Sequence, residues 1–111
     1  MIVADRDEDW IGKAAEGLRS AGHHVTGVTC DVTDAAPQVT AMIERAVSTY
    51  GRPDAAFNDA GINTDSVATL ETGDGAFDRV MNVNLRGVWH CMKAELRQMM
   101  ERGSGAIVTA M

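Results

Sequence analysis

The residues best suited to chemistry stand where four short apolar runs of the sequence end. Those ends are Asp5, Asp31, residues 58–61 and Met111, and three of the four are polar. If the runs are parallel strands, their carboxyl ends meet at one edge of a sheet, where such sheets bind ligands. Carboxylates there can accept hydrogen bonds from ribose hydroxyls or from an exocyclic amine. The same residues could instead cap the following helices and turns, and spacing alone leaves both interpretations open.

Other common chemistries lack their sequence signatures. A dinucleotide-binding turn G-x-G-x-x-G could start at Gly73 and Gly75, but the pattern fails at Asp78. The Walker pattern for phosphate binding needs a lysine that neither Lys13 nor Lys93 supplies. The nucleophile pattern G-x-S-x-G is also missing. We therefore expect neither a phosphate-binding turn within these residues nor hydrolase chemistry.

The composition is that of one globular domain. The 111 residues are 45% hydrophobic and 23% charged, and their net charge of -6 disfavours nucleic acid and anionic lipid as partners. No apolar run approaches the roughly 20 residues that cross a bilayer. The start MIVADRDEDW is acidic, unlike a signal peptide, so we expect a cytoplasmic protein without membrane attachment. Cys30 and Cys91 show no zinc-type spacing, and we expect both thiols to be reduced and buried.

Strands and helices are expected to alternate along residues 1–111, as in a single α/β domain with a parallel sheet and flanking helices. The expected order is strand 2–5, helix 9–21, strand 24–30, helix 34–50 with Asp34 as its N-cap, strand 54–58, loop 62–75, helix 76–102 and strand 105–111. Apolar stripes on the helices predict a core that includes Trp10, Ile11, Ala14, Ala15, Leu18, Tyr50, Phe77, Met81, Leu85, Val88, Met92, Leu96 and Met99.

Five segments in order resemble the short-chain dehydrogenase/reductase family. VADRDED resembles that family's second strand with its acidic end, and CDVTD resembles the end of its third strand. FNDAGIN resembles the N-N-A-G turn, FDRVMNVNLRGVW the helix with the catalytic asparagine, and GAIVTAM the fifth strand. The resemblance spans the chain and implies a Rossmann-type parallel sheet that lacks the family's first strand and everything after the fifth. Residues 1–111 would then be one partial dinucleotide-binding domain.

The resemblance implies that NAD is the cofactor. Asp5 would accept hydrogen bonds from the 2′- and 3′-hydroxyls of the adenosine ribose and repel a 2′-phosphate, so that NAD is preferred over NADP. Arg6, the next residue, could soften that preference. Asp31 and Val32 would border the adenine.

The turn with Asn58, Ala60 and Gly61 would pass close to the ribose, since Gly61 has no side chain to block the approach. Asp59 replaces the second asparagine of this turn, and a carboxylate cannot donate a sheet-bracing hydrogen bond as an amide can. Asn84 matches the catalytic asparagine, which holds a water of the proton relay by distorting the helical hydrogen-bond ladder.

The implied activity is NAD(P)-dependent oxidation or reduction of a small-molecule alcohol, sugar or ketone. This chain would be a partial form, inactive alone and with weak NAD binding or none. The family's Tyr-x-x-x-Lys pair is not found, because the single tyrosine, Tyr50, is followed four residues later by Asp54. The catalytic serine would come after Met111. Without the first strand, the family's sheet order separates strands 2–5 and 24–30 from strands 54–58 and 105–110, so we expect exposed edges and marginal stability.

Two other functions stay open at this point. A receiver-like signalling domain would also carry acidic strand ends, as VADRDED and PDAAFNDAG do, but the strand spacing does not fit and the expected lysine is missing. A non-catalytic interaction partner could pair with full-length relatives, because helix 76–102 resembles the one through which the family builds its oligomers.

Overall fold

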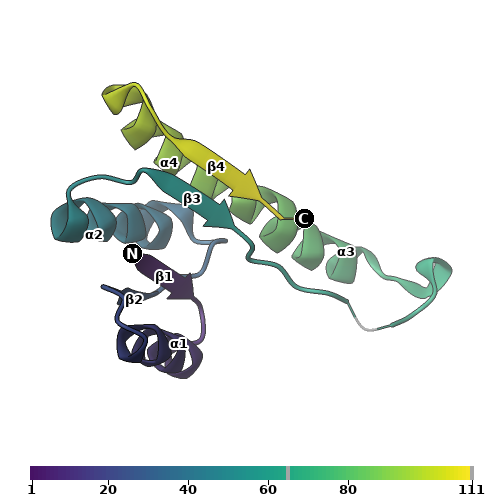
Figure 1. Ribbon diagram of the computed structural model, residues 1–111. Helices are drawn as coiled ribbons and strands as arrows, with labels where there is room; N and C mark the ends of the chain where they lie inside the picture. Colours follow the sequence, from purple (N-terminus) through teal and green to yellow (C-terminus); the bar gives the residue numbers. More distant parts are fainter. Residues whose placement is uncertain (65, 111) are drawn as a thin grey trace.

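The protein, seen in a computed structural model that describes residues 1–64 and 66–110, contains two separate parallel strand pairs. β1 (Ile2–Asp5) pairs with β2 (Thr26–Thr29), and β3 (Ala55–Asn58) pairs with β4 (Ala106–Thr109). Among the described residues no ladder joins one pair to the other. β1, β3 and β4 point the same way in Figure 1. The parallel α/β architecture and the separation into these two pairs are confirmed.

The first helix, α1 (Glu8–Ser20), packs against the first strand pair. Asp7 caps it, because its carboxylate accepts a hydrogen bond from the amide of Trp10 at 2.9 Å. Ile11 and Ala15 form its buried side, and Gly27 of β2 lets the helix approach closely. A Cβ atom at Gly27 would lie 3.4 Å from that of Ala15.

The second helix starts with a π-helical segment, η1 (Ala35–Val39), and continues as α2 (Thr40–Tyr50). Asp34 occupies the N-cap position of this helix, as expected, but its side chain makes no capping hydrogen bond. Its carboxylate accepts a hydrogen bond from Nε2 of Gln38 at 3.0 Å and binds no helical amide. Pro37, which has no N–H to donate, lies within the widened first turn.

The expected single helix 76–102 consists of three consecutive parts. α3 (Asp74–Met81) leads into the π-helical segment η3 (Asn82–Gly87), and α4 (Val88–Arg102) follows. Gly103, in the left-handed conformation with φ 74°, ends α4. The loop before α3 contains a short 3-10 turn, η2 (Thr69–Glu71). Asp65 in that loop and Met111 at the end of expected strand 105–111 lie outside the described residues.

The core is small and joins the two strand pairs through helices. Its centre is a cluster of Cys30, Val39 and Cys91, against which Val32, Met42 and Ala94 pack. The buried apolar side chains in the described chain are Ile11, Ala15, Val25, Cys30, Val39, Ile43, Val88, Cys91 and Met99. The radius of gyration is 15.4 Å, whereas a compact domain of this length has about 13 Å. Both thiols are free and buried, as expected.

Several side chains expected in the core are exposed instead. Trp10 is 63% exposed, and Tyr50 is 40% exposed with its hydroxyl 3.0 Å from that of Thr26. Phe77, Met81, Leu85 and Leu96 are exposed as well. The buried side of α4 runs through Val88, Cys91, Glu95 and Met99. Val88 and Met99 were predicted, whereas Cys91 and Glu95 each lie one position before the predicted Met92 and Leu96. None of the helices formed by the described residues is both long and apolar enough to cross a membrane.

Candidate functional site

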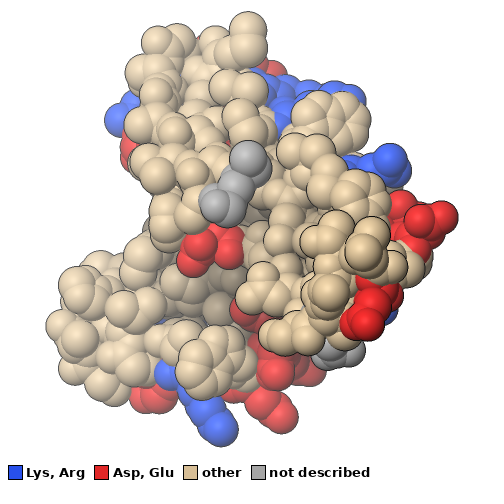
Figure 2. Space-filling view, turned by 90° about the vertical axis from the view of Figure 1, so that its right-hand side faces the viewer, with Lys and Arg blue, Asp and Glu red and all other residues tan. Residues whose placement is uncertain are grey.

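The polar strand ends lie on the side of the molecule toward which the strands point. Figure 2 shows this side, which is hollowed between an upper and a lower lobe and has acidic side chains around the hollow. The upper lobe contains β3, β4 and α4, and the lower lobe contains β1, β2 and α1 (Figures 1 and 2). The expected ligand site therefore faces solvent between the two strand pairs.

Asp5 is held at the carboxyl end of β1. Its main-chain oxygen accepts a hydrogen bond from the amide of Cys30 at 2.9 Å, and Oδ1 accepts one from the amide of Asp7 at 2.9 Å. The helix cap is Asp7, not Asp5. Oδ2 of Asp5 is bound by no residue that the structure describes, so this oxygen can accept a hydrogen bond from a ligand.

Asp31 lies in the turn that follows β2. Oδ1 accepts hydrogen bonds from the hydroxyl of Thr33 at 2.7 Å and from the amide of Thr33 at 2.9 Å. These bonds hold the pKa of Asp31 below its usual range, and the positive charge of Arg6 acts in the same direction. The main-chain amide of Asp31 donates to Oε1 of Gln38 at 2.8 Å. Asp31 thus stabilises the turn that contains it and remains ionised at neutral pH.

Val32 packs this turn against the long helix formed by α3, η3 and α4. A Cβ atom placed on Gly87 would lie 2.5 Å from Cγ2 of Val32, so only glycine allows this approach. Nδ1 of His90 donates a hydrogen bond to the main-chain oxygen of Val32 at 2.9 Å. Sequence analysis did not identify Gly87 or His90 as part of the site. The glycine directly after V-N-L-R was the available signal, because a buried glycine in a helix usually marks a close approach.

Asn84 fixes the turn after β3. Its Oδ1 accepts a hydrogen bond from the amide of Ile62 at 2.8 Å, and its Nδ2 donates to the oxygen of Ile62 at 2.9 Å. A Cβ atom on Gly61 would lie 3.4 Å from Oδ1 of Asn84. Asn84 lies within η3, so the departure from the α-helical ladder expected around this residue is present.

Asn58, at the end of β3, is bound to the same helix. Its Nδ2 donates a hydrogen bond to Oε2 of Glu95 at 2.9 Å, and its main-chain oxygen accepts one from Ala110 at 3.0 Å. Glu95 is only 3% exposed, and this burial raises its pKa, while the bond from Asn58 acts in the opposite direction. Asp59 is exposed, so strand and helix are braced from position 58 instead. Sequence analysis missed Glu95.

The two cysteines are not suited to nucleophilic chemistry. Burial, with the nearby Glu95 and Cys30 adding to its effect, raises the pKa of Cys91 to about 12. Burial likewise raises the pKa of Cys30, and Asp31 and Asp34 contribute. Both groups are therefore neutral thiols at physiological pH.

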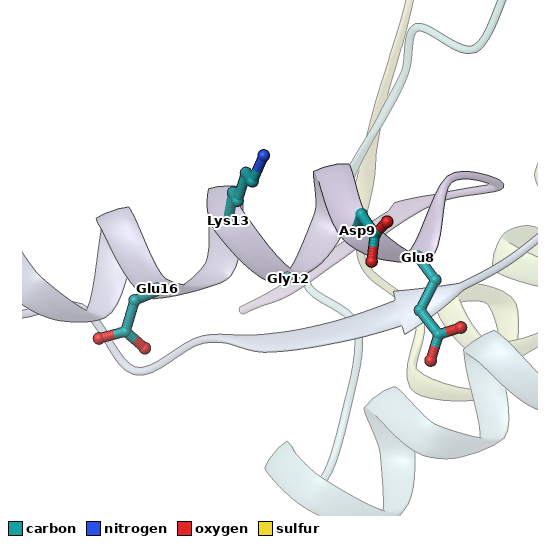
Figure 3. Close-up of a pocket in the computed structure, with 5 residues that line it drawn as sticks. All are labelled: Glu8, Asp9, Gly12, Lys13 and Glu16. Atoms are coloured by element: carbon teal, nitrogen blue, oxygen red, sulfur yellow. The ribbon is translucent and has the colours of Figure 1, made fainter.

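A shallow hollow on the outside of α1 is a poor candidate site. It is lined by Glu8, Asp9, Gly12, Lys13 and Glu16. The side chains in Figure 3 point in different directions from the helix and do not converge on a common point. This hollow holds none of the polar strand ends.

The strand ends form a continuous row. Asp5 binds Cys30 next to Asp31, Val32 touches Gly87, and Asn84 in the same helical segment holds the turn at Gly61 and Ile62. Oδ2 of Asp5, which no described residue binds, can accept a hydrogen bond from a ribose hydroxyl. Gly61 presents no side chain that would block a ribose passing its turn. The described residues thus fit the adenosine end of a dinucleotide.

Comparisons with known proteins agree with this fold. The model of the short chain dehydrogenase family matches residues 1–111. The short-chain reductase protein NovJ of Streptomyces niveus is 40% identical over 108 residues, which cover 97% of this chain and 40% of NovJ. An NAD+-bound xylitol dehydrogenase has a TM-score of 0.93 at 29% identity, covering 97% of this chain and 41% of that one. Actinorhodin polyketide ketoreductase with NADPH has a TM-score of 0.91 at 35% identity, covering 97% and 41%. The chain thus spans about two fifths of the length of the proteins that it matches.

Proposed function

Because the chain belongs to the short-chain dehydrogenase/reductase family, we propose that it forms the adenosine-binding part of an NAD(P)-dependent oxidoreductase. The substrate class is a small-molecule alcohol, sugar or ketone. When bound, the nicotinamide of the cofactor supplies or takes the hydride. The residues of this chain bind and orient the adenosine end. The family match over the whole chain gives no support to a receiver-like signalling function.

One observation carries the proposal: the row of contacts from Asp5 through Val32 and Gly87 to Asn84 and Gly61. It brings the ends of three strands and one helix to the same edge, although the two strand pairs share no ladder. Simple capping explains the bonds of Asp31 with Thr33, but it leaves Oδ2 of Asp5 without a role. A ribose hydroxyl that donates to this oxygen would give it one.

NAD is the proposed cofactor in preference to NADP. Asp5 places a carboxylate at the end of β1, and a carboxylate repels a 2′-phosphate while it accepts hydrogen bonds from free ribose hydroxyls. Asp31, ionised beside Arg6, adds negative charge to this edge and offsets the positive charge of that arginine. Solved relatives are bound to NAD+ in one case and to NADPH in another, so family membership alone does not decide between the two cofactors.

Asn84 is proposed to act through the main chain of η3. Both polar atoms of its side chain are occupied by Ile62, so the side chain fixes the turn beside the ribose. A π-helical segment leaves main-chain oxygens outside the regular ladder, and such an oxygen can hold a water of a proton relay. Asn84 is thus a catalytic residue in this proposal.

We also propose that the chain self-associates through residues 76–102. Phe77, Leu85 and Trp89 are at least half exposed there. Met81 and Arg86 lie beside them on a shallow surface that also includes Asp78, Arg79 and Asn82. Sedimentation of the pure chain tests this: a dimer that the substitution Leu85→Glu converts to a monomer is expected, and a monomeric native chain would contradict it.

Adenosine binding is tested by NMR titration of the ¹⁵N-labelled 111-residue chain with 5′-AMP and with adenosine 2′,5′-bisphosphate. We expect 5′-AMP to shift the amides of Val32 and Gly61 at millimolar concentration and the bisphosphate to bind more weakly. Asp5→Asn should weaken 5′-AMP binding and narrow the difference between the two ligands. Asp9→Asn, on the outside of α1, makes the same charge change and should alter neither affinity. Shifts confined to other parts of the chain would overturn the proposal.

A further inference from the structure

Glu95 is a carboxylic acid in a position that suits an apolar side chain. The buried residues of α4 are Val88, Cys91, Glu95 and Met99, at spacings of three and four that mark one helical face. Glu95 is 3% exposed. A buried carboxylate costs free energy unless hydrogen bonds compensate, so its presence in an apolar row calls for a role.

The described contacts of Glu95 point to one partner. Its Oε2 accepts a hydrogen bond from Nδ2 of Asn58 at 2.9 Å. The ion pairs found among the described residues join Arg19 to Glu16 and Arg52 to Asp54, and neither involves Glu95. The neighbouring Cys91 is a neutral thiol. Glu95 therefore acts on Asn58 and on no cation in the described chain.

Asn58 and Ile62 are hydrogen-bonded to side chains of the continuous helix formed by η3 and α4. Glu95 binds the side chain of Asn58, and Asn84 binds both main-chain groups of Ile62. Eleven residues of helix separate Glu95 from Asn84, which is roughly 16 Å of rise. The four peptide steps from residue 58 to residue 62 can span only about 14 Å when fully extended. The side chains of Glu95 and Asn84 bridge the small difference between these two lengths, so residues 58–62 must be nearly extended. Figure 1 shows this segment extended beside the long helix.

We infer that Glu95 is a positioning residue for the adenosine-binding turn, because it fixes Asn58 and thereby the path of residues 59–61. The inference rests on the proposed function, since this turn is where the ribose would pass. The side chain of Asp59 cannot donate a hydrogen bond that braces the strand. Asn58 donates one to Glu95 instead. The hydrogen bonds of Glu95 with Asn58 and of Asn84 with Ile62 thus determine where Gly61 lies relative to Asp5 and Val32.

The experiment uses the ¹⁵N-labelled 111-residue chain and three variants. Glu95→Gln keeps an oxygen that can accept from Asn58, and Glu95→Leu keeps size but removes the acceptor. Glu101→Leu, on the exposed side of α4, is the matched control. The measurements are the amide shifts of Gly61 and Ile62, the affinity for 5′-AMP, and the pH dependence of the side-chain amide signal of Asn58.

In the native chain the Asn58 signal should follow a single titration that Glu95→Gln abolishes. Glu95→Leu should move the Gly61 and Ile62 amides and weaken 5′-AMP binding roughly tenfold, as expected for loss of one buried bond to a charged group. Glu95→Gln should restore both within about a factor of two, and Glu101→Leu should change neither. Rescue by glutamine is the result that a merely space-filling side chain would not give.

Two results would overturn the inference: native Gly61 shifts and native 5′-AMP affinity in a folded Glu95→Leu chain, or an Asn58 signal that ignores pH in the native chain. The second measurement needs no variant and so applies even if Glu95→Leu unfolds. If 5′-AMP shifts no residue of the native turn, the proposed function fails. Movement of Gly61 and Ile62 in Glu95→Leu would then still support the positioning by Glu95.

Discussion

Replacing Gly87 by alanine should separate the long helix from the turn at Val32. The added Cβ would lie 2.5 Å from Cγ2 and 3.1 Å from Cβ of Val32, about 1 Å inside an ordinary carbon contact. Val32 cannot turn aside easily, because its side chain is β-branched and its main-chain oxygen is bound to His90. Such overpacking costs about 1–3 kcal/mol, whereas alanine in a helix gains about 1 kcal/mol over glycine. The net expectation is a loss of about 1 kcal/mol in the free energy of unfolding.

Gly17→Ala is the matched control, since Gly17 is also helical and nothing lies within 4 Å of its added Cβ. This variant should gain about 1 kcal/mol, so the two alanine variants should differ by about 2 kcal/mol in urea unfolding. Removing the obstacle with Val32→Ala should recover most of the loss in the double variant with Gly87→Ala, giving a favourable coupling energy. If Gly87→Ala stabilises the chain as much as Gly17→Ala does, the close packing of helix and turn is refuted.

Three further predictions concern the hydrogen bonds and buried groups of the site. Asn84→Ala removes both bonds to Ile62, so amide exchange at Ile62 should accelerate roughly tenfold or more while exchange in α1 stays unchanged. Because burial raises the pKa of Glu95, the folded chain binds more protons than the unfolded one. Its stability should therefore fall as pH rises from about 4.3 through the folded pKa, and the Glu95→Gln chain should lack this fall in urea titrations across that range. Cys30 and Cys91, with raised pKa values, should not react with a thiol reagent at pH 7 until urea unfolds the chain, and fast labelling of the native chain would contradict their burial.

The order of the elements could be predicted because it depends on local signals. The expected strand 54–58 and the observed Ala55–Asn58 differ by one residue, since a short apolar run that ends in polar residues marks a strand. The side of a helix that is buried depends on what it packs against, and that information is not local. Leu96 was expected in the core and Glu95 was not, because the middle of the stripe on α4 was placed at Met92 and Leu96, one residue after the buried Cys91 and Glu95. The π-helical segment η1 gave no local signal, whereas the distortion at Asn84 was expected from the family resemblance.

The places of the candidate residues in the fold could be predicted from the sequence, but their hydrogen-bond partners could not. Asp5, Asp31 and Asn58 lie at strand ends, and the positions of strand ends follow from sequence. Which of them bind a neighbour and which keep a free oxygen depends on turns of specific geometry. Oδ1 of Asp31 is bound by Thr33, whereas Oδ2 of Asp5 is bound by no residue that the structure describes. A hydrogen bond between residues 37 positions apart, such as that from Asn58 to Glu95, has no signature in a single sequence.

The relative position of the two halves of the site is set by helix packing. β1 and β3 share no ladder in the described chain, so hydrogen bonds between strands cannot hold Asp5 at a fixed distance from Gly61. The path between them runs instead through Cys30 and Cys91 in the core and through Val32 against Gly87. Packed side chains tolerate small displacements less than an open edge does, because protein interiors are close-packed. Adenosine affinity should therefore respond to changes at these helix contacts even where both strand ladders stay intact.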